Sequence, residues 1–481
     1  MSSVGQHVVA RTRRAGKSTD ARVKRVELYL LPVTTRVPLK FGSETLTTVT
    51  CARVRIQLVD RMGRTAEGWG ETPLSVQWAW PSSLSYTVRH DAMVQFCRLL
   101  AEAWSEHRDW GHPLEIGNAF QWDVLTQLAC DFNIGRESEE GMPHLASLLC
   151  CSAFDIALHD AYGVLHQVPT YRTYCAEYMN SDLADFLTPA KGSSLSFQNI
   201  YPSEFLLAEP KRQLPVWHLV GGLDPLEPDD LPQARLQDGY PELLGDWIDR
   251  DGLFSLKVKL RGDDAAWDYD RLMRVGRIAR SHGVQWLSAD FNCTVREPAY
   301  VIDILDRLER DEPGIFQMIT YVEQPFPYDL EKNRIDVRSV AKRKPIFLDE
   351  SAHNWRFVML GQSLGWNGVA LKTCKTQTGA ILSLCWARAH GMAIMVQDLT
   401  NPMLAQIPHV LLAAHGNTTM GVESNAMQFY PEASSLEAKV HPGVYQRRNG
   451  KLDLSTVTGP GFGYHVEQVA RTLPNATVVH G

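Results

Sequence analysis

Charged residues lie within or at the end of several short apolar segments of the chain, and they are of the types that bind metals or move protons. The segments have the length of β-strands and recur roughly every 25 to 35 residues. They are residues 256–260 with Lys257 and Lys259, 286–290 ending in Asp290, 319–323 ending in Glu323, 346–349 ending in Asp349, and 368–372 ending in Lys372. Stretches with helical spacing, such as 268–281 and 297–310, lie between them. Strands that alternate with helices in this way are typical of a (β/α) barrel.

The chemistry of this set follows from where a barrel would place it. Barrel strands carry functional residues at their C-terminal ends, so these side chains should converge on one mouth. Asp290, Glu323 and Asp349 offer only oxygen ligands, which predicts a hard divalent cation, Mg²⁺ or alternatively Mn²⁺. A single charged residue at a strand end is usually a cap or a surface charge, but a whole set in matching register is hard to explain that way.

Lysines flank the predicted cation site. Lys257 and Lys259 lie two residues apart in one strand, so their side chains project from the same face. Lys259 ends the second predicted strand and Lys372 the sixth, so the two should face each other across an eight-stranded barrel. A nearby cation should lower the pKa of a lysine, and the neutral amine could then act as a base.

Length and composition exclude several other classes of protein. The 481 residues, 44% hydrophobic and 21% charged, suit two or three ordinary globular domains. The formal net charge of −7 gives no basic surface for nucleic acid, and no uninterrupted apolar run is long enough to span a membrane. Nine scattered cysteines without Cys-x-x-Cys spacing are typical of buried thiols in a reducing cytoplasm.

Residues 26–170 are expected to form an α+β domain that precedes the barrel. Its predicted elements are strands at 26–31, 47–59 and 66–71, a loop at 34–46, a turn at 60–63, and helices at 90–104 and 145–165. A loop at 74–81 contains Trp78 and Trp80. These tryptophans either pack against a neighbouring domain or cover the barrel mouth.

The rest of the chain divides around this domain and the barrel. The basic segment 1–25 lacks the apolar core of a signal peptide; we expect a disordered tail, with an organelle address as the alternative. Residues 171–212 form an irregular excursion, interpreted as an extra lid or an oligomer contact. The barrel is assigned to 213–424, with a first strand at 216–219, a seventh at 393–398 and an eighth at 419–423. Residues 425–481 should fold back on the domain and the barrel.

Together these motifs resemble the enolase superfamily, in particular the mandelate racemase/muconate lactonizing enzyme family on its muconate-lactonizing side. The matching pieces are Lys257-Val258-Lys259, Asp290, Glu323, Asp349 and Lys372, supported by Gly68-Trp69-Gly70-Glu71, Ile156-Ala157-Leu158-His159-Asp160 and Gly459-Pro460-Gly461-Phe462-Gly463. The similarity covers nearly all of residues 26–466 except 171–212. It implies an α/β fold with an α+β capping domain on a modified TIM barrel, (β/α)7β.

The resemblance also implies a reaction. One Mg²⁺ would be held by Asp290, Glu323 and Asp349, while Lys259 and Lys372 act as general acid and base. Lys257 would help to hold the substrate carboxylate or lower the pKa of its neighbour. The α-proton of a carboxylate is a very weak acid, so its removal requires a cation that takes up charge developing on the carboxylate oxygens. Enzymes of this superfamily combine a Lys or His base with Mg²⁺ in this way. We therefore expect a cytoplasmic enzyme, homo-oligomeric, with a small-molecule carboxylate substrate.

The chain departs from the family at two places. The family often continues with Lys-x-x-Lys-x-Gly-Gly, whereas here Lys372-Thr373-Cys374-Lys375 is followed by Thr376-Gln377-Thr378-Gly379. The second departure is the excursion 171–212. Both departures suggest an unusual substrate, so the substrates of the family cannot be transferred to this chain.

Three functions are compatible with these residues. The first is an isomerase: an epimerase, racemase or cycloisomerase that removes and returns the α-proton. The second is a dehydratase or other lyase that eliminates through the same enolate, in which Asp398 or Glu423 could contact the substrate as an acid, although either could be a structural hydrogen-bonding group. The third is a non-catalytic binding relative, which the intact ligand and lysine set disfavours.

Overall fold

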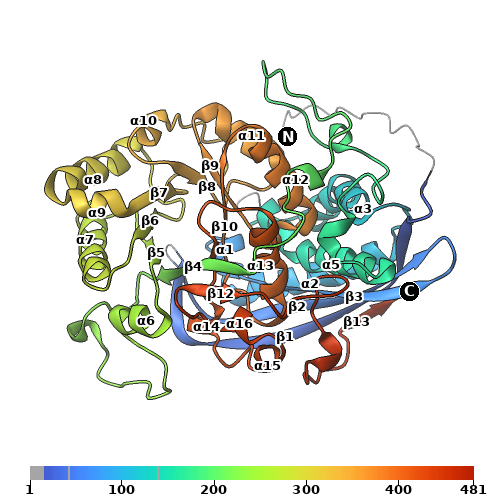
Figure 1. Ribbon diagram of the computed structural model, residues 1–481, viewed down its shortest axis with the longest axis horizontal. Helices are drawn as coiled ribbons and strands as arrows, with labels where there is room; N and C mark the ends of the chain where they lie inside the picture. The colour runs from blue at the N-terminus through green and yellow to red at the C-terminus, as the bar shows by residue number, and fades with distance from the viewer. Residues whose placement is uncertain (1–15, 42–43, 138–139) are drawn as a thin grey trace.

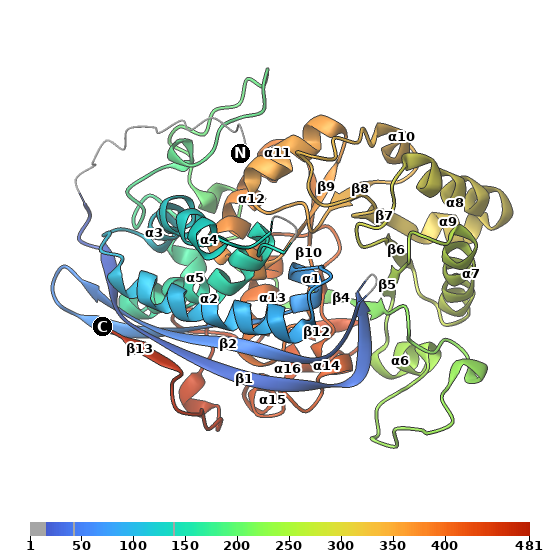
Figure 2. The same cartoon turned by 180° about the vertical axis from the view of Figure 1, so that it is seen from behind.

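The computed structural model describes residues 16–41, 44–137 and 140–481, and these residues form two sheets. One is an antiparallel sheet in the order β13-β1-β2-β3. The other runs β11-β10-β9-β8-β7-β6-β5-β4-β12 and closes through a pairing of β11 with β4. Figures 1 and 2 show the antiparallel sheet and its helices as a cap beside the barrel. The predicted α/β class, a barrel with an α+β capping domain, is confirmed.

The antiparallel sheet is more extended than the sequence suggested. β1 (Ala21–Phe41), β2 (Glu44–Asp60) and β3 (Thr65–Pro73) pair in order. The predicted loop 34–46 is wrong in its described residues, because β1 and β2 extend into it. Their pairing is interrupted by a register shift after Thr34↔Thr48 and resumes at Leu39↔Leu46. β1 also begins at Ala21, inside the tail expected to end at residue 25. Of the rest of that predicted tail, residues 16–20 are described and Asp20 is buried, whereas residues 1–15 lie outside the described residues.

Helices cover one face of this sheet. They are α1 (Val76–Ala79), α2 (Tyr86–Glu106), α3 (Pro113–Ala119), the π-helix η1 (Phe120–Leu125), α4 (Thr126–Phe132) and α5 (His144–His166). α5 is long and apolar enough to cross a membrane by length and composition, but 94% of its most apolar window is buried inside the protein. Gly68 and Gly70 of β3 explain the close approach of α5, because a Cβ at either position would overlap its backbone at Ala161 or Ala153.

The barrel confirms the predicted alternation of strands and helices. Its strands are β4 (Gln213–Val220), β5 (Ser255–Lys259), β6 (Trp286–Asp290), β7 (Ile319–Glu323), β8 (Ile346–Leu348), β9 (Gly368–Leu371), β10 (Ala393–Val396) and β11 (Val422–Glu423). Adjacent strands pair in parallel. Aromatic side chains fill the interior, with Tyr321 stacked on Phe347 at 4.3 Å and Trp217 beside them. The barrel is therefore a packed core with its chemistry confined to one end.

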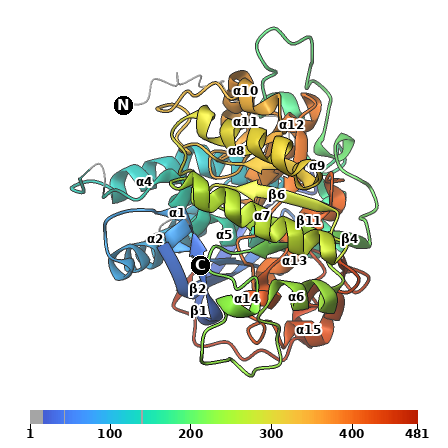
Figure 3. The ribbon, with the colours of Figure 1, turned by 90° about the vertical axis from the view of Figure 1, so that its left-hand side faces the viewer.

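The connections between these strands form the outer layer of the barrel (Figure 3). They are η5 (Pro228–Asp230), α6 (Leu244–Asp251), α7 (Ala265–Ser281), α8 (Pro298–Asp311), α9 (Pro313–Met318), α10 (Arg338–Ala341), α11 (Trp355–Leu364), η6 (Thr373–Lys375), α12 (Gln377–Ala389), η7 (Met403–Ala405) and α13 (Gln406–His415). Each of the seven strand-to-strand connections contains a helix, as (β/α)7β requires.

Two irregular segments tie the cap to the barrel. The excursion 171–212 contains only the short turns η2 (Thr170–Thr173), η3 (Leu183–Asp185) and η4 (Pro202–Glu204) within its described residues. The C-terminal segment contains α14 (Ala426–Phe429), α15 (Glu437–Val440), α16 (Pro442–Tyr445), β12 (Lys451–Asp453), η8 (Val466–Gln468) and β13 (Val478–His480). β12 pairs antiparallel with β4 and β13 with β1, so this segment does return to both the barrel and the cap.

Candidate active site

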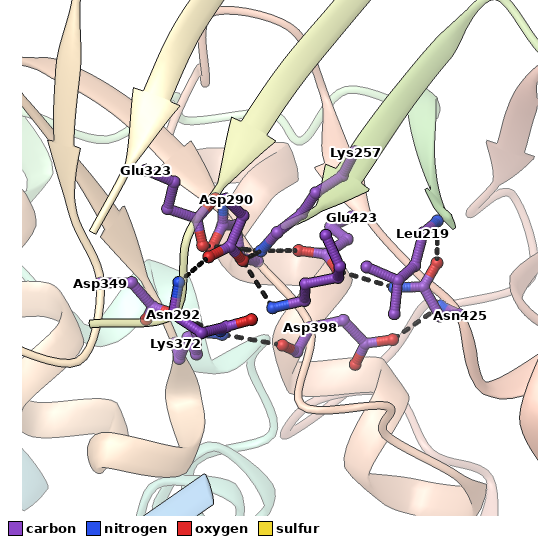
Figure 4. Close-up of polar contacts among 12 residues, drawn as sticks. Leu219, Lys257, Asp290, Asn292, Glu323, Asp349, Lys372, Asp398, Glu423 and Asn425 are labelled. Atoms are coloured by element: carbon purple, nitrogen blue, oxygen red, sulfur yellow. Dashed lines mark hydrogen bonds and ion pairs between the residues drawn. The ribbon is translucent and has the colours of Figure 1, made fainter. Parts of the chain in front are cut away.

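The predicted carboxylates and lysines lie at the same end of adjacent barrel strands. Lys259, Asp290 and Glu323 are direct register neighbours on β5, β6 and β7. Asp349 immediately follows β8, and Lys372 immediately follows β9. All five side chains are buried, none more than 7% exposed. The structure thus brings together the residues that the sequence pattern singled out, and Figure 4 shows Asp290, Glu323, Asp349 and Lys372 among them.

Lys257 lies at the centre of this group. Its Nζ is 2.6 Å from Glu323 Oε1 and 3.1 Å from both Asp290 Oδ2 and Glu423 Oε2. It also donates to Gln397 Oε1 at 3.2 Å. One ammonium group therefore bridges acidic side chains from three strands, and Figure 4 shows it between Asp290 and Glu423. In this arrangement Lys257 supplies positive charge to the carboxylates, a role additional to the predicted substrate contact.

The other two lysines pair with different carboxylates. Lys259 Nζ lies 2.5 Å from Asp290 Oδ2. Lys372 Nζ lies 3.0 Å from Asp349 Oδ2 and donates to the carbonyl oxygen of Asp398 at 2.9 Å. Because β5 and β9 are four strands apart in the closed barrel, these ion pairs belong to opposite sides of its wall.

Burial and neighbouring charges shift the pKa values of the three carboxylates in different directions. Burial raises the pKa of Glu323, and the adjacent charge of Asp290 raises it further, well above its ordinary value. Burial also opposes ionisation of Asp290, but attraction from Lys259 and Lys257 outweighs it and lowers its pKa. The pKa of Asp349 is likewise lowered against burial, by Lys372 and Lys375. The lysines therefore do not stabilise the three buried carboxylates equally: the charged form is favoured at Asp290 and Asp349, and the protonated form at Glu323.

The same carboxylates, together with Glu423, raise the pKa values of two lysines. Burial alone would lower the pKa of Lys372, but Asp349 outweighs it and the pKa is raised. Burial is likewise outweighed at Lys257, whose pKa is raised well above its ordinary value by Glu323 and Glu423. The side chains of the site alone therefore do not lower the pKa of Lys257 or Lys372, whereas the sequence predicts a lowered pKa for a lysine beside a cation. A lowered lysine pKa requires additional positive charge, such as a bound cation, among the carboxylates.

The donor chemistry fits the predicted cation, although no ready-made ligand cluster is present. Asp290, Glu323 and Asp349 offer buried carboxylate oxygens and no sulfur or imidazole, the set that hard cations prefer. Among the residues that the structure describes, no three acidic, histidine or cysteine side chains converge as a group that could hold a metal ion. Their oxygens instead contact the ammonium groups of Lys257, Lys259 and Lys372.

The two predicted loop tryptophans occupy different environments. The segment is not a surface loop: Trp78 lies in α1 and Trp80 follows it, and both are buried. Trp78 Nε1 donates to Glu350 Oε1 at 3.0 Å, and its ring centre lies 5.1 Å from Lys372 Nζ. Both tryptophans belong to the apolar core of the cap. Trp78 also reaches the barrel mouth through these contacts, whereas Trp80 is in a packing position.

Asp398 and Glu423, proposed from the sequence as substrate contacts, are held by hydrogen bonds within the protein. The Asp398 carboxylate accepts from the backbone N–H groups of Asn401 and Asn425, both at 2.7 Å. Burial and the charge of Glu423 raise its pKa to about 7. Glu423 Oε1 accepts from Asn425 Nδ2 at 2.7 Å, while its other oxygen contacts Lys257. Both side chains thus shape the site, and substrate contact by either stays a prediction.

Three further residues contact this network and were not assigned from the sequence. Gln397 contacts both Lys257 and Glu323. Lys375 donates to the backbone carbonyl of Asp349 and lies 3.3 Å from its Oδ1. Glu350 follows Asp349 and meets Trp78. The sequence offered a reason to assign Lys375, since it completes the Lys-x-x-Lys pattern. Glu350 and Gln397 each lie next to a residue that was assigned.

The two departures from the family pattern contact each other. Gln377 Nε2 donates to the hydroxyl groups of Tyr171 and Tyr174, both at 3.2 Å, at the start of the excursion. Thr378 donates to Asp155 of α5 through its hydroxyl and backbone N–H, both at 2.8 Å. Thr376, just before them, has φ +77°, a backbone conformation that favours glycine. These residues are buried and join α12 to the excursion and to the cap, directly after Lys375, which contacts Asp349.

Comparison with known proteins agrees with this architecture. Residues 240–470 match the family model described as enolase C-terminal domain-like. None of the curated proteins matches the chain.

Solved structures of similar fold include several enzymes. Muconate lactonizing enzyme from Pseudomonas fluorescens, in complex with muconolactone, has a TM-score of 0.59 at 14% identity and covers 94% of this chain and 98% of its own. N-succinyl Arg/Lys racemase from Bacillus cereus has a TM-score of 0.60 at 15% identity, with 95% and 99% covered. A dipeptide epimerase from Enterococcus faecalis, complexed with Mg and the dipeptide L-Leu-L-Tyr, has a TM-score of 0.58 at 15% identity, with 92% and 99% covered. At such identities the similarity establishes the fold alone.

Proposed function

Because residues 240–470 match the enolase C-terminal domain-like family model, we propose that the protein is a Mg²⁺-dependent enzyme that moves the proton α to a substrate carboxylate. The reaction class we favour is isomerisation, as an epimerase, racemase or cycloisomerase of the muconate-lactonizing type. The observation that carries this proposal is the arrangement of two buried lysines on opposite barrel strands, Lys259 paired with Asp290 and Lys372 with Asp349.

The metal-binding side chains in this proposal are Asp290, Glu323 and Asp349. When bound, Mg²⁺ (or Mn²⁺) supplies positive charge that polarises the substrate carboxylate and offsets the acidic groups that raise the pKa of Lys372. The raised pKa of Glu323 supports this assignment, since a buried carboxylate beside two others favours an added cation.

The lysines perform the proton transfers. A substrate whose α-carbon lies between them presents one face to each, so one amine removes the proton and the opposite ammonium group returns one. Lys257, held among Glu323, Asp290 and Glu423, positions the carboxylates and adds positive charge beside the substrate. Trp78 covers Lys372 from the cap side and limits the access of water.

Elimination remains the alternative. A dehydratase of the same fold needs one lysine as base and an acid on the leaving-group side. Asp398 is the candidate acid, because burial and Glu423 raise its pKa to about 7 and favour the protonated form near neutrality. Its two backbone hydrogen bonds favour a structural role instead. We therefore rank elimination second and a non-catalytic relative third.

The setting of the enzyme is part of the same proposal. The buried charged mouth suits a small-molecule carboxylate, with neither nucleic acid nor membrane as partner, and we propose a cytoplasmic homo-oligomer. The domain limits that we propose are 26–170 for the cap, 171–212 for the excursion, 213–424 for the barrel and 425–481 for the C-terminal segment.

Exchange of the substrate α-proton with solvent deuterium tests this function. Wild-type protein with Mg²⁺ would be incubated in D₂O with a panel of chiral carboxylates that includes dipeptides and N-acyl amino acids, and followed by NMR and chiral chromatography. We expect α-deuteration with loss of stereochemical purity for one class of substrate. The Asp290→Asn variant should abolish it. Deuteration accompanied by loss of water would establish the dehydratase, and an absence of exchange across the panel would contradict the isomerase.

A further inference from the structure

A large cavity lies on the flank of the barrel, outside the charged mouth. It has a volume of about 540 Å³ and is enclosed by α6, α14, α15 and the residues after α16. Figures 1 and 3 both show α6 beside α14 and α15 at the edge of the molecule. Neither the three carboxylates nor the two opposed lysines of the mouth line it. The cavity is therefore a separate feature of the fold.

The walls of this flank cavity are basic, although the protein as a whole has a net charge of −7. Its cationic side chains are Arg250, Lys439, Arg447 and Arg448, and its acidic ones are Asp251 and Glu432. Asp251 is already neutralised, because Arg447 Nε lies 2.7 Å from its Oδ2. The remaining excess of positive charge favours an anionic ligand.

Arg447 is the buried member of the basic set. Its side chain is fully buried, and beyond the contact with Asp251 its Nη1 donates to the carbonyl oxygen of Ser424 at 3.4 Å. Its Nη2 has no hydrogen-bond partner among the described residues. A buried guanidinium group with an unused donor is costly. Because Nη2 is itself buried, a ligand oxygen from the cavity would satisfy this donor after a shift of the Arg447 side chain.

The cavity is also lined by apolar and aromatic side chains, which contact the basic ones. The ring centre of Trp247 lies 5.5 Å from the guanidinium group of Arg250 and 5.3 Å from that of Arg447. Tyr240, Met427 and Tyr430 line the cavity as well. The cavity volume of about 540 Å³ lies within the range of small-molecule sites and is far larger than a single inorganic ion needs.

We propose that the flank cavity binds a small organic anion, one that carries a phosphate or carboxylate group next to an aromatic or other apolar part. The anionic group would contact Arg447, Arg448 and Lys439, since guanidinium groups suit planar and tetrahedral oxyanions. The apolar part would lie against Trp247 and Tyr240. This inference is independent of the reaction proposed for the barrel mouth.

The position of Arg447 also connects the cavity to the mouth. Ser424, which accepts from Arg447, directly follows Glu423, and Glu423 contacts Lys257. A ligand that shifts Arg447 would therefore alter the end of β11. The amide groups of residues 422–428 should report its binding through changed hydrogen exchange.

Titration calorimetry with phenyl phosphate tests the site. We expect saturable binding with one site per chain, weaker binding of inorganic phosphate, and weaker binding at high salt. Arg448→Gln and Lys439→Gln, at exposed positions, should each weaken the affinity about fivefold. Lys332→Gln removes an equally exposed charge outside the cavity, where its side chain is 84% exposed, and should leave the affinity unchanged. Arg447→Lys keeps the charge but removes the unused donor, and should also weaken binding.

Hydrogen–deuterium exchange then locates the probe. Protection should appear in residues 244–251 and 438–448, and Lys259→Gln in the barrel mouth should bind phenyl phosphate as the wild type does. The proposal is overturned if wild-type protein shows no saturable binding up to about 10 mM phenyl phosphate. It is also overturned if Lys259→Gln abolishes the binding, or if neither Arg448→Gln nor Lys439→Gln weakens it.

Discussion

The ammonium group of Lys372 lies 5.1 Å from the ring centre of Trp78, so a residue of the cap covers a lysine of the barrel. Lys375 lies 5.7 Å from the same ring, and the indole N–H donates to Glu350 next to Asp349. A cation above an aromatic face is stabilised by about 0.5 to 2 kcal/mol, more when both groups are shielded from water. Trp78 therefore contributes to the electrostatics of the mouth as well as to its closure.

Replacement of Trp78 should impair turnover without unfolding the protein. We expect Trp78→Ala to lower kcat about tenfold, the equivalent of about 1.4 kcal/mol, because Lys372 loses the ring and gains water. Trp78→Phe keeps a ring and loses only the hydrogen bond to Glu350, so its loss should be smaller. Trp78→Ala and Trp80→Ala should each reduce stability by about 3 kcal/mol or more, because both rings are buried in the cap core, but Trp80→Ala should leave kcat of the folded protein unchanged. Steady-state kinetics and thermal unfolding of the three variants separate these effects; equal kinetics for Trp78→Ala and wild type would leave Trp78 a packing role only.

Metal binding should depend on the strand-end carboxylates. Asp290→Asn and Glu323→Gln should each remove most of the Mg²⁺ or Mn²⁺ measured by elemental analysis after gel filtration. In wild type, metal at a hundred times its Kd should raise the free energy of unfolding by about 2.7 kcal/mol, and the variants should lose this gain. Glu350→Gln is the matched control, because Glu350 is buried beside Asp349 but is not assigned as a ligand. If both carboxylate variants retain metal at the wild-type level, the site lies elsewhere.

The barrel strands could be predicted from the sequence because several of them end in a charged residue. Asp290 and Glu323 end β6 and β7 at the residues expected, since an apolar segment of strand length with a terminal charge leaves little freedom in the assignment. The hairpin of β1 and β2 was predicted less well. Pairing across residues 34–46 resumes after a register shift. The local alternation of apolar and polar residues indicates neither such a shift nor the partner of a strand.

Contacts between distant segments could not be predicted either. The bridging position of Lys257 depends on Glu423, 166 residues away, and the contact of Gln377 with Tyr174 joins residues 203 positions apart. The sequence presented the glycine-pair replacement and the excursion as two separate irregularities. In the structure Gln377 and the start of the excursion are in contact, and the unusual substrate that both departures suggest stays a prediction.

Asp160 should make stability depend on pH. Its carboxylate accepts from the backbone N–H groups of Trp69 and Phe462, and burial raises its pKa to about 7 from an ordinary value of 3.8. The folded state then binds more protons than the unfolded state between these values, so the contribution of Asp160 falls as pH rises from about 4 to about 7. The full change is on the order of 4 kcal/mol. Denaturant titration of wild type and Asp160→Asn from pH 5 to 8 measures the free energy of unfolding of each. The stability of wild type relative to the variant should fall toward pH 7 and become constant above it. Parallel pH profiles of the two proteins would contradict the prediction.

Restoring the family glycine should affect stability more than catalysis. Gln377→Gly removes two hydrogen bonds to Tyr171 and Tyr174, and we expect a loss of about 2 kcal/mol in the free energy of unfolding. Because the Gln377 amide donates to tyrosines of the excursion and not to the carboxylates or lysines of the mouth, KM and substrate preference should stay as in wild type. A double-mutant cycle with Tyr174→Phe should give a coupling energy of about 1 kcal/mol. A changed substrate preference in Gln377→Gly would show instead that this position shapes the substrate pocket.

The opposed lysines should divide the reaction by stereochemistry. Lys259 on β5 and Lys372 after β9 lie four strands apart, so each faces one side of a substrate held between them. Lys259→Ala and Lys372→Ala should each lower interconversion of the two stereoisomers by about a thousandfold, because each removes the acid or base for one face. Each variant should still exchange the α-proton of the one stereoisomer whose base survives, and the two variants should retain opposite stereoisomers. NMR of each pure isomer in D₂O measures both quantities. The assignment fails if either variant still interconverts the isomers near the wild-type rate, or if both variants exchange the same isomer.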